Sequence, residues 1–285
     1  MGAPRCVWNV HATLGEGPLW LARENAIYFV DIKKPALHRY SLSDGAQHTW
    51  EMPEQIGWVL PRTTKPNFIA GFKSGFAELT LDPFTITPIG APEPELPDNR
   101  RNDAKVDKAG RIWAGSMDDL ETNVTGQLFR LDPDMSWRVM DGGYKVCNGP
   151  TFNLAHDVLY HTDSGAKTIY AFDLSPEGEI SNKRVFVKFE KEWGSPDGMT
   201  TDAEGGIWIA HWDGARVSRF TPDGKLDRSI ALPASRITSC AFAGPNLDRM
   251  FVTSASMSRE NEEFAGALFE IDPGVRGAPQ HAFAG

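Results

Sequence analysis

Short apolar segments alternate with polar turns along the whole chain. The apolar segment 27–30 (Ile-Tyr-Phe-Val) leads, after a short polar break, to a segment of alternating character at 37–40 and an acidic turn at 44–45. Short runs rich in β-branched and aromatic residues, bounded by turn residues, are typical of β-strands. The pattern therefore predicts a chain built mainly of strands.

This unit occurs six times along the chain. Its first strand is anchored at Ile27, Phe68, Ile112, Leu159, Ile207 and Met250, with spacings of 41, 44, 47, 48 and 43 residues. That period is typical of a four-stranded propeller blade, which buries its faces only by stacking against neighbouring blades. We therefore predict an all-β fold: one domain over residues 1–285, a six-bladed β-propeller with four-stranded antiparallel blades around a central channel.

Two segments fall outside the six units. The apolar segment 6–10 precedes the first unit, and we expect it to pair in the last blade and close the ring. The Pro-rich segment 91–97 reads as a loop between blades, because the strand pattern resumes directly after it. The competing interpretation is a β-sandwich whose strand spacing is coincidental.

Four polar residues share one position in the repeat. Counting back ten or eleven residues from the anchors gives Glu16, Asn102, Asn148 and Asp197 in four blades. The other two blades offer Gly57 or Trp58, and Ser239 or Cys240. We place this position just before the innermost strand, so that the side chains converge on the channel mouth. Taken singly, the Asn-Gly and Asp-Gly pairs also suit ordinary hairpin turns.

Two carboxylates brought together in such a ring repel each other unless one is protonated or a cation neutralises them. We therefore predict one divalent metal ion bound by Glu16, Asn148 and Asp197. Oxygen ligands favour Ca²⁺, Mg²⁺ or Mn²⁺, while Fe²⁺ and catalytic Zn²⁺ stay open. A purely structural ion would have a full set of protein ligands, and the shortage here favours open coordination positions.

Composition and charge disfavour several classes of binding partner. The chain has 38 acidic and 29 basic residues, which disfavours binding to nucleic acid. No apolar run is long enough for a membrane span, and the start lacks the pattern of a signal peptide, so we expect a cytoplasmic protein without membrane contacts. Its three cysteines are far apart and encode neither a disulfide framework nor a thiolate zinc site. A closed propeller needs no partner, and we expect a monomer.

Several short motifs, in order and at matching spacing, resemble one known family. Residues 15–18 (Gly-Glu-Gly-Pro), 100–103 (Arg-Arg-Asn-Asp), 148–149 (Asn-Gly) and 196–198 (Pro-Asp-Gly) are similar to the regucalcin (senescence marker protein)/gluconolactonase family of metal-dependent sugar lactonases. The similarity runs nearly from end to end, through 105–107, 115–117, 171–173, 180–184 and 238–240. Bacterial aldonolactonases look closer than the animal proteins.

The resemblance implies a six-bladed propeller whose metal is held by Glu16, Asn148 and Asp197, with Arg100 and Asn102 facing the substrate. One departure is the sequence Met-Asp-Asp-Leu at 117–120, where animal members carry consecutive acidic residues after the methionine. Contacts from a lid at this place are therefore not carried over. Arg100 has an alternative interpretation as a surface residue in a basic pair with Arg101. Asp103 reads as a supporting partner or a turn residue, outside the catalytic set.

These residues predict a metal-dependent lactonase that hydrolyses a sugar-acid lactone, such as glucono-, xylono- or arabinonolactone, to the aldonic acid. The lactone carbonyl would bind the metal, Asp197 would help to deprotonate the attacking water, and Arg100 and Asn102 would orient the sugar. Two alternatives stay open: a non-enzymatic calcium-binding regulatory protein, and a metal-dependent esterase acting on another lactone or a phosphotriester. The residues do not distinguish the lactones or their ring sizes.

Rival hydrolase chemistries lack their motifs. The chain contains no Gly-x-Ser-x-Gly elbow, no His-Glu-x-x-His pair and no phosphate-binding Gly-Lys-Ser/Thr loop. His161 and His211 lie in or just after apolar strands. They are either core packing residues or a histidine base near the channel, and packing is the commoner role for such histidines.

Overall fold

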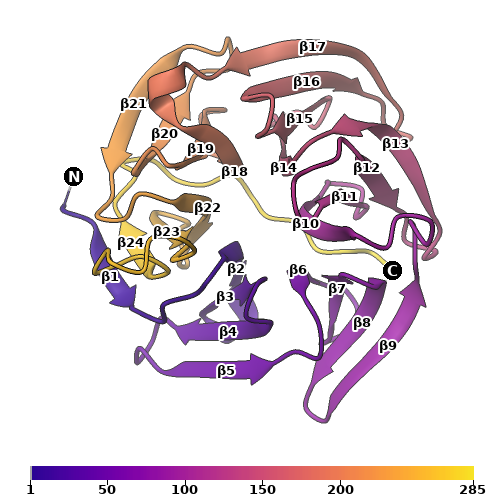
Figure 1. The fold of residues 1–285 in the computed structure, drawn as a ribbon, viewed down its shortest axis with the longest axis horizontal. Helices are drawn as coiled ribbons and strands as arrows, with labels where there is room; N and C mark the ends of the chain where they lie inside the picture. Colours follow the sequence, from indigo (N-terminus) through magenta and orange to yellow (C-terminus); the bar gives the residue numbers. More distant parts are fainter. Residues whose placement is uncertain (1) are drawn as a thin grey trace.

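The computed structural model describes residues 2–285, which form six four-stranded antiparallel sheets arranged around a central axis (Figure 1). The predicted six-bladed propeller is confirmed, and six separate sheets exclude the β-sandwich. Strand β1 pairs with β24 in the last sheet, so the N-terminal strand closes the ring as expected. The Pro-rich segment 91–97 lies between β9 and β10, in the loop between two blades.

The blades follow one another along the chain. Blade 1 contains β2 (Gly15–Leu21), β3 (Ala26–Asp31), β4 (Ala36–Ser41) and β5 (Gln47–Glu51), and blade 2 contains β6 (Ile56–Pro61), β7 (Phe68–Phe72), β8 (Gly75–Leu81) and β9 (Phe84–Gly90). Blade 3 contains β10 (Asn99–Val106), β11 (Ile112–Asp118), β12 (Gly126–Leu131) and β13 (Trp137–Tyr144), and blade 4 contains β14 (Cys147–Phe152), β15 (Val158–Asp163), β16 (Thr168–Leu174) and β17 (Ile180–Lys188). Blade 5 contains β18 (Ser195–Thr201), β19 (Ile207–Trp212), β20 (Arg216–Phe220) and β21 (Leu226–Ala231), and blade 6 contains β22 (Ile237–Ala243), β23 (Arg249–Ser254), β24 (Leu268–Ile271) and β1 (Arg5–Trp8).

The innermost strand of each blade carries the shared polar position. Strands β2, β6, β10, β14, β18 and β22 surround the channel and contact one another from blade to blade (Figure 1). The apolar anchors lie in the second strand of each blade, one strand further from the channel. The second strand is buried on both faces and reads as an apolar run. The innermost strand carries polar residues, Gly and Pro, and gives no such signal.

The shared polar position therefore lies inside the innermost strands rather than in turns before them. Each of these strands has a register irregularity there, for example between Glu16 and Leu19 and between Asn148 and Thr151. Gly149 has φ +58°, and a Cβ added to it would lie 2.3 Å from Cε of Met199. The Asn-Gly pair at 148–149 thus belongs to a bulge within a strand, not to a hairpin turn.

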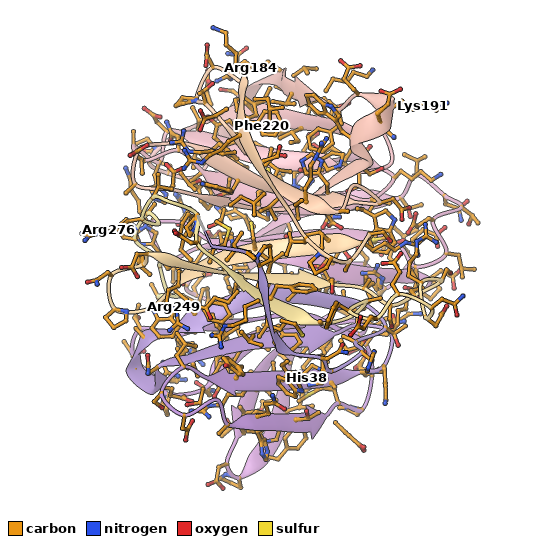
Figure 2. The ribbon with its side chains drawn as sticks, turned by 90° about the vertical axis from the view of Figure 1, so that its left-hand side faces the viewer. His38, Arg184, Lys191, Phe220, Arg249 and Arg276 are labelled. Carbon is orange, nitrogen blue, oxygen red and sulfur yellow. The ribbon has the colours of Figure 1, made fainter. Side chains whose placement is uncertain are left out.

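The C-terminal segment crosses the channel on one face of the propeller (Figure 1). The backbone N–H of Ala278 donates to Thr201 O at 3.0 Å, that of Phe283 to Pro61 O at 2.8 Å, and that of Ala284 to Gly110 O at 3.1 Å. Figure 2 shows Arg276, at the start of this segment, and Lys191 on opposite faces. The segment joins blades that lie far apart in the ring.

Helical structure in residues 2–285 is confined to two single turns, η1 (Ala22–Glu24) and η2 (Lys191–Trp193). Neither of these described helices has the length or the hydropathy needed to cross a membrane.

Candidate functional site

A cavity of about 480 Å³ lies on the channel axis, within the usual size range of small-molecule sites. It contains all five residues that the sequence singled out: Glu16, Arg100, Asn102, Asn148 and Asp197. Its remaining walls are formed by Leu14, Lys33, Met117, Asp119, Leu120, Glu121, Lys145, Val146, Ser164, Gly165, Ser195, Trp212 and Met257. The structure thus brings together residues that are up to 181 positions apart in the chain.

Two buried carboxylates face this cavity. Burial, together with the charge of Asp103, raises the pKa of Glu16 to about 8, against a smaller opposing effect of Arg100. Burial and then the charge of Glu16 raise the pKa of Asp197 well above its usual range. Oδ1 of Asp197 is buried and has no hydrogen-bond partner among the described residues. The two carboxylates therefore repel each other when both are ionised, and a bound cation would remove this repulsion.

Asn148 is held in place by a hydrogen-bond chain. Its Oδ1 accepts from Nδ2 of Asn102 at 2.9 Å, and its Nδ2 donates to Oγ of Ser164 at 3.0 Å. Ser164 Oγ in turn donates to the carbonyl oxygen of Pro196 at 2.6 Å, next to Asp197. Because a carbonyl oxygen has two lone pairs, Oδ1 of Asn148 keeps one free for a ligand.

These residues fit a hard divalent cation. The donors are two carboxylates, one with an unpartnered buried oxygen, and one amide oxygen that keeps a free lone pair. Oxygen donors of this kind suit Ca²⁺, Mg²⁺ or Mn²⁺. Among residues 2–285 no group of three or more His, Cys, Asp or Glu is arranged to hold a metal, so the amide of Asn148 is needed to complete the set.

Arg100 is a buried residue of the cavity wall, and its alternative interpretation as a surface arginine was wrong. It is 3% exposed, its Nε donates to Oδ1 of Asp119 at 2.7 Å, and its Nη1 donates to Oδ1 of Asn102. Arg101, next in the strand, is buried too and pairs with Glu93. Adjacent strand residues point to opposite sides, so the two arginines serve different contacts.

Asn102 lines the cavity, but most of its hydrogen-bond donors and acceptors are already paired within the protein. Its Nδ2 donates to Cys147 O at 2.7 Å and to Asn148 Oδ1 at 2.9 Å, while its Oδ1 accepts from Arg100. Asn102 thus links Arg100 to Asn148. This geometry makes it foremost a positioning residue for the two neighbours.

Asp103 lies in β10 and is buried, so the simple turn interpretation does not hold. Burial raises its pKa to about 6, although Lys105 lowers it in part. Asp103 does not line the cavity with Glu16, but its charge contributes to the raised pKa values of Glu16 and Asp197. The charge of Asp103 therefore affects the ionisation of these two carboxylates although Asp103 does not line the cavity.

Asp119 was not predicted from the sequence as a site residue, although the segment 117–120 that contains it differs from the animal members of the family. Asp119 accepts from Arg100 and from Lys33 Nζ, each at 2.7 Å, and from Gln55 Nε2 at 3.1 Å. It thereby joins three blades at the cavity wall. Its signal in the sequence was its place one residue beyond the second strand of blade 3.

A second feature missed from the sequence is an aspartate at the end of the second strand in three blades. Asp31 accepts from the backbone N–H groups of Thr13, Leu14, Lys33 and Lys34 at 2.7–3.1 Å. Asp118 likewise accepts from the backbone N–H groups of Thr122 and Asn123, and Asp163 from those of Val146 and Gly165. Such bonds fix the loops around the cavity, and the aspartates' common place in the repeat was the available signal.

His161 and His211 do not line the cavity. His161 is fully buried in β15 against the ring of Tyr144, with centroids 4.7 Å apart, and His211 is hydrogen-bonded through Nδ1 to Trp193 O at 2.8 Å. Both lie where core packing residues are expected. No histidine is among the residues that form the cavity.

His161→Phe is expected to reduce the acid sensitivity of the fold. Burial lowers the pKa of His161 to about 3, so the unfolded chain takes up the proton first as the pH falls below 6.5. Stability is therefore lost between about pH 6.5 and pH 3, by about 2 kcal/mol at pH 5 from this residue alone. Urea unfolding at pH 8 and pH 5 measures the difference, and an equal loss in wild type and variant would contradict the assignment.

The fold and the site together define a six-bladed propeller with a buried carboxylate and amide site on its axis. A family model described as the SMP-30/Gluconolactonase/LRE-like region matches residues 14–256, and the chain belongs to this family. The resemblance noted from the sequence is thus confirmed.

Individual relatives cover nearly the whole chain. Regucalcin of Gallus gallus is 35% identical over 293 residues, with 98% of each chain covered, and 6-deoxy-6-sulfogluconolactonase of Pseudomonas putida is 33% identical over 292 residues, covering 99% of this chain and 98% of the relative. The solved structure of a luciferin-regenerating enzyme has a TM-score of 0.93 and 28% identity, with 99% of each chain covered. The family therefore includes lactonases as well as proteins named for calcium.

Proposed function

We propose that this protein is a metal-dependent lactonase that hydrolyses a sugar-acid lactone to the aldonic acid. One observation carries the proposal: two buried carboxylates, one with an unpartnered oxygen, share an axial cavity with a buried arginine. Membership in a family that includes gluconolactonases supports the same reaction class. A glucono-, xylono- or arabinonolactone would fit the cavity chemistry, which is rich in hydrogen-bonding groups.

Glu16, Asn148 and Asp197 would hold the divalent cation, which when bound supplies a Lewis acid that polarises the lactone carbonyl. Asp197, which lines the cavity and whose Oδ1 has no hydrogen-bond partner among the described residues, would take the proton of an attacking water. Nε and Nη1 of Arg100 donate hydrogen bonds to Asp119 and Asn102, and Nη2 has no hydrogen-bond partner in residues 2–285. Nη2 is thus the donor available to a sugar hydroxyl or to the carboxylate that forms.

The calcium-binding alternative rests on the name regucalcin carried by several relatives. A protein that only binds calcium would hold the ion without turning over any lactone. An acid-release assay on a panel of aldonolactones, with each of Ca²⁺, Mg²⁺, Mn²⁺ and Zn²⁺, separates the two functions. Rates must exceed the spontaneous opening of each lactone, and binding of calcium without such an excess would refute the proposed activity. Turnover of phosphotriesters alone would favour the esterase alternative.

Arg100→Lys is expected to lower kcat/KM for an aldonolactone by roughly 10²-fold, mainly through KM. Lysine keeps the charge but cannot hold Asp119 and Asn102 while offering a third planar donor to the substrate. Steady-state kinetics over a wide range of lactone concentration measure the split between KM and kcat. A variant with unchanged KM would remove Arg100 from the substrate contacts.

A further inference from the structure

The charged residues of the cavity are distributed unevenly over its walls. Arg100 and Lys33 share the carboxylate of Asp119, so each of these two cations has a carboxylate partner. Trp212 and Met257 contribute apolar surface from blades 5 and 6. Lys145, just before β14, is the third cationic residue that lines the cavity, on the wall of blade 4.

Lys145 has no internal counterion. Within residues 2–285 its Nζ makes neither a hydrogen bond nor an ion pair, whereas Nζ of Lys33 lies 2.7 Å from Asp119. Glu121 also lines the cavity, but it does not pair with Lys145 in the structure. The charge of Lys145 is therefore available to a ligand.

The stem of Lys145 is held against the cavity wall. A Cβ added to Gly165 would lie 2.6 Å from Cβ, 2.9 Å from Cγ and 2.8 Å from Cδ of Lys145, so only a glycine leaves room for the stem. Asp163 accepts from the backbone N–H groups of Val146 and Gly165 at 3.2 and 3.1 Å, which fixes the backbone on both sides of this contact. Gly165 itself lines the cavity. The stem of Lys145 is thus packed against Gly165, while the side chain as a whole is exposed to solvent.

We propose that Lys145 selects substrates that carry a second anionic group, a phosphate or a sulfonate on the exocyclic end of the sugar lactone. The ammonium group is a compact charge with three donors, which suits a terminal anionic group with several acceptor oxygens. Arg100 and the two buried carboxylates face the reacting ring, so the substituent would extend toward blade 4. This inference rests on the proposed lactonase function and specifies its substrate class.

Binding of the product acids tests the inference independently of turnover. Calorimetry would compare 6-phosphogluconate with gluconate, which differ only in the phosphate. Wild type is expected to bind 6-phosphogluconate at least about tenfold more tightly, and Lys145→Gln to lose most of that difference. Lys145→Arg should keep it, because the charge and the donors remain.

Two further variants serve as controls. Lys188→Gln removes the same charge from the outer strand of blade 4, where the residue is exposed, and should leave both affinities unchanged. Glu121→Gln removes an anion from the cavity wall and should strengthen the binding of both acids, and that of the more highly charged 6-phosphogluconate the more. Equal affinities for the two acids in wild type, or a preference that survives Lys145→Gln, would overturn the inference.

Kinetics separate this inference from the lactonase proposal. In wild type, kcat/KM for 6-phosphogluconolactone should exceed that for gluconolactone and fall more steeply with ionic strength. Lys145→Gln should equalise the two lactones through the KM of the phosphorylated one. Hydrolysis of both at equal rates would leave the enzyme a lactonase and reject the role of Lys145. Absence of hydrolysis with a retained, Lys145-dependent binding preference would reject the activity and keep the anion site.

Discussion

Asp197→Asn is expected to lower kcat for lactone hydrolysis by at least roughly 10³-fold while preserving the propeller fold. The amide has nearly the same shape, but it cannot accept the proton of the attacking water and it removes one charge from the proposed cation site. Oδ1 of Asp197 has no hydrogen-bond partner among the described residues, so the substitution breaks no internal contact at that atom. Steady-state acid release, corrected for spontaneous opening, measures the loss.

The same substitution should stabilise the metal-free protein. Burial and the charge of Glu16 raise the pKa of Asp197, which means that its ionised form is disfavoured in the folded state. Removing that charge relieves the repulsion, and we expect Tm to rise by roughly 2–4 °C in the presence of chelator. An inactive variant that is also more stable is the signature of a functional residue that is kept at a cost to the fold.

Asp202 provides a matched control one residue beyond the end of the same strand. It is fully buried, but Arg219 donates to it through Nε at 2.6 Å and Trp208 through Nε1 at 2.9 Å. Burial would raise the pKa of Asp202, yet these donors lower it overall. Asp202→Asn should therefore destabilise the protein, by about 3 kcal/mol, with little change in kcat at temperatures where it is folded.

The two variants thus have opposite expected effects on stability, and only Asp197→Asn is expected to lower kcat. If Asp197→Asn kept near-normal kcat, Asp197 would have no catalytic role. If it lost stability as Asp202→Asn does, Asp197 would be a structural residue instead.

The sequence predicted the blade count and the closure of the ring because the second strands give a periodic signal. These strands are buried on both faces, so each reads as an apolar run at a regular spacing, as at 27–30 and 207–209. The shared polar position was expected just before the innermost strand but lies within it, because these strands line the channel with polar residues and continue through bulges. A pattern of turn residues such as Asn148-Gly149 looks the same in a bulge as in a hairpin.

The central residues of the candidate site were predictable because the repeat places them in register. Glu16, Asn148 and Asp197 occupy one position in three blades, and the structure brings them to one cavity. Asp119 and Lys145 were not predicted as site residues, since they lie in loops outside the strands that repeat. Their place depends on contacts that no local pattern encodes, such as the one between Lys145 and Gly165.

Removal of divalent ions is expected to abolish lactone hydrolysis, and addition of an ion should restore it. The proposed ligands Glu16 and Asp197 carry raised pKa values when no cation is present, because both are buried and their charges repel. Binding of a cation must therefore displace protons from these carboxylates. Affinity should rise with pH through the pKa of Glu16, which is about 8, and calorimetry in buffers of different ionisation enthalpy should detect proton release.

Stability gives a second measure of the same ion. A cation that binds only the folded state raises the free energy of unfolding by about 2.7 kcal/mol at a concentration one hundred times its Kd. This gain should disappear in Asp197→Asn, which has lost one ligand charge, and persist in Asp202→Asn, whose ion pair with Arg219 lies outside the cavity. Unchanged turnover in the presence of chelator would refute the metal mechanism. Stabilisation by the ion without any turnover would favour a protein that only binds calcium. The site would then bind the cation, but Asp197 would not act as a base in hydrolysis.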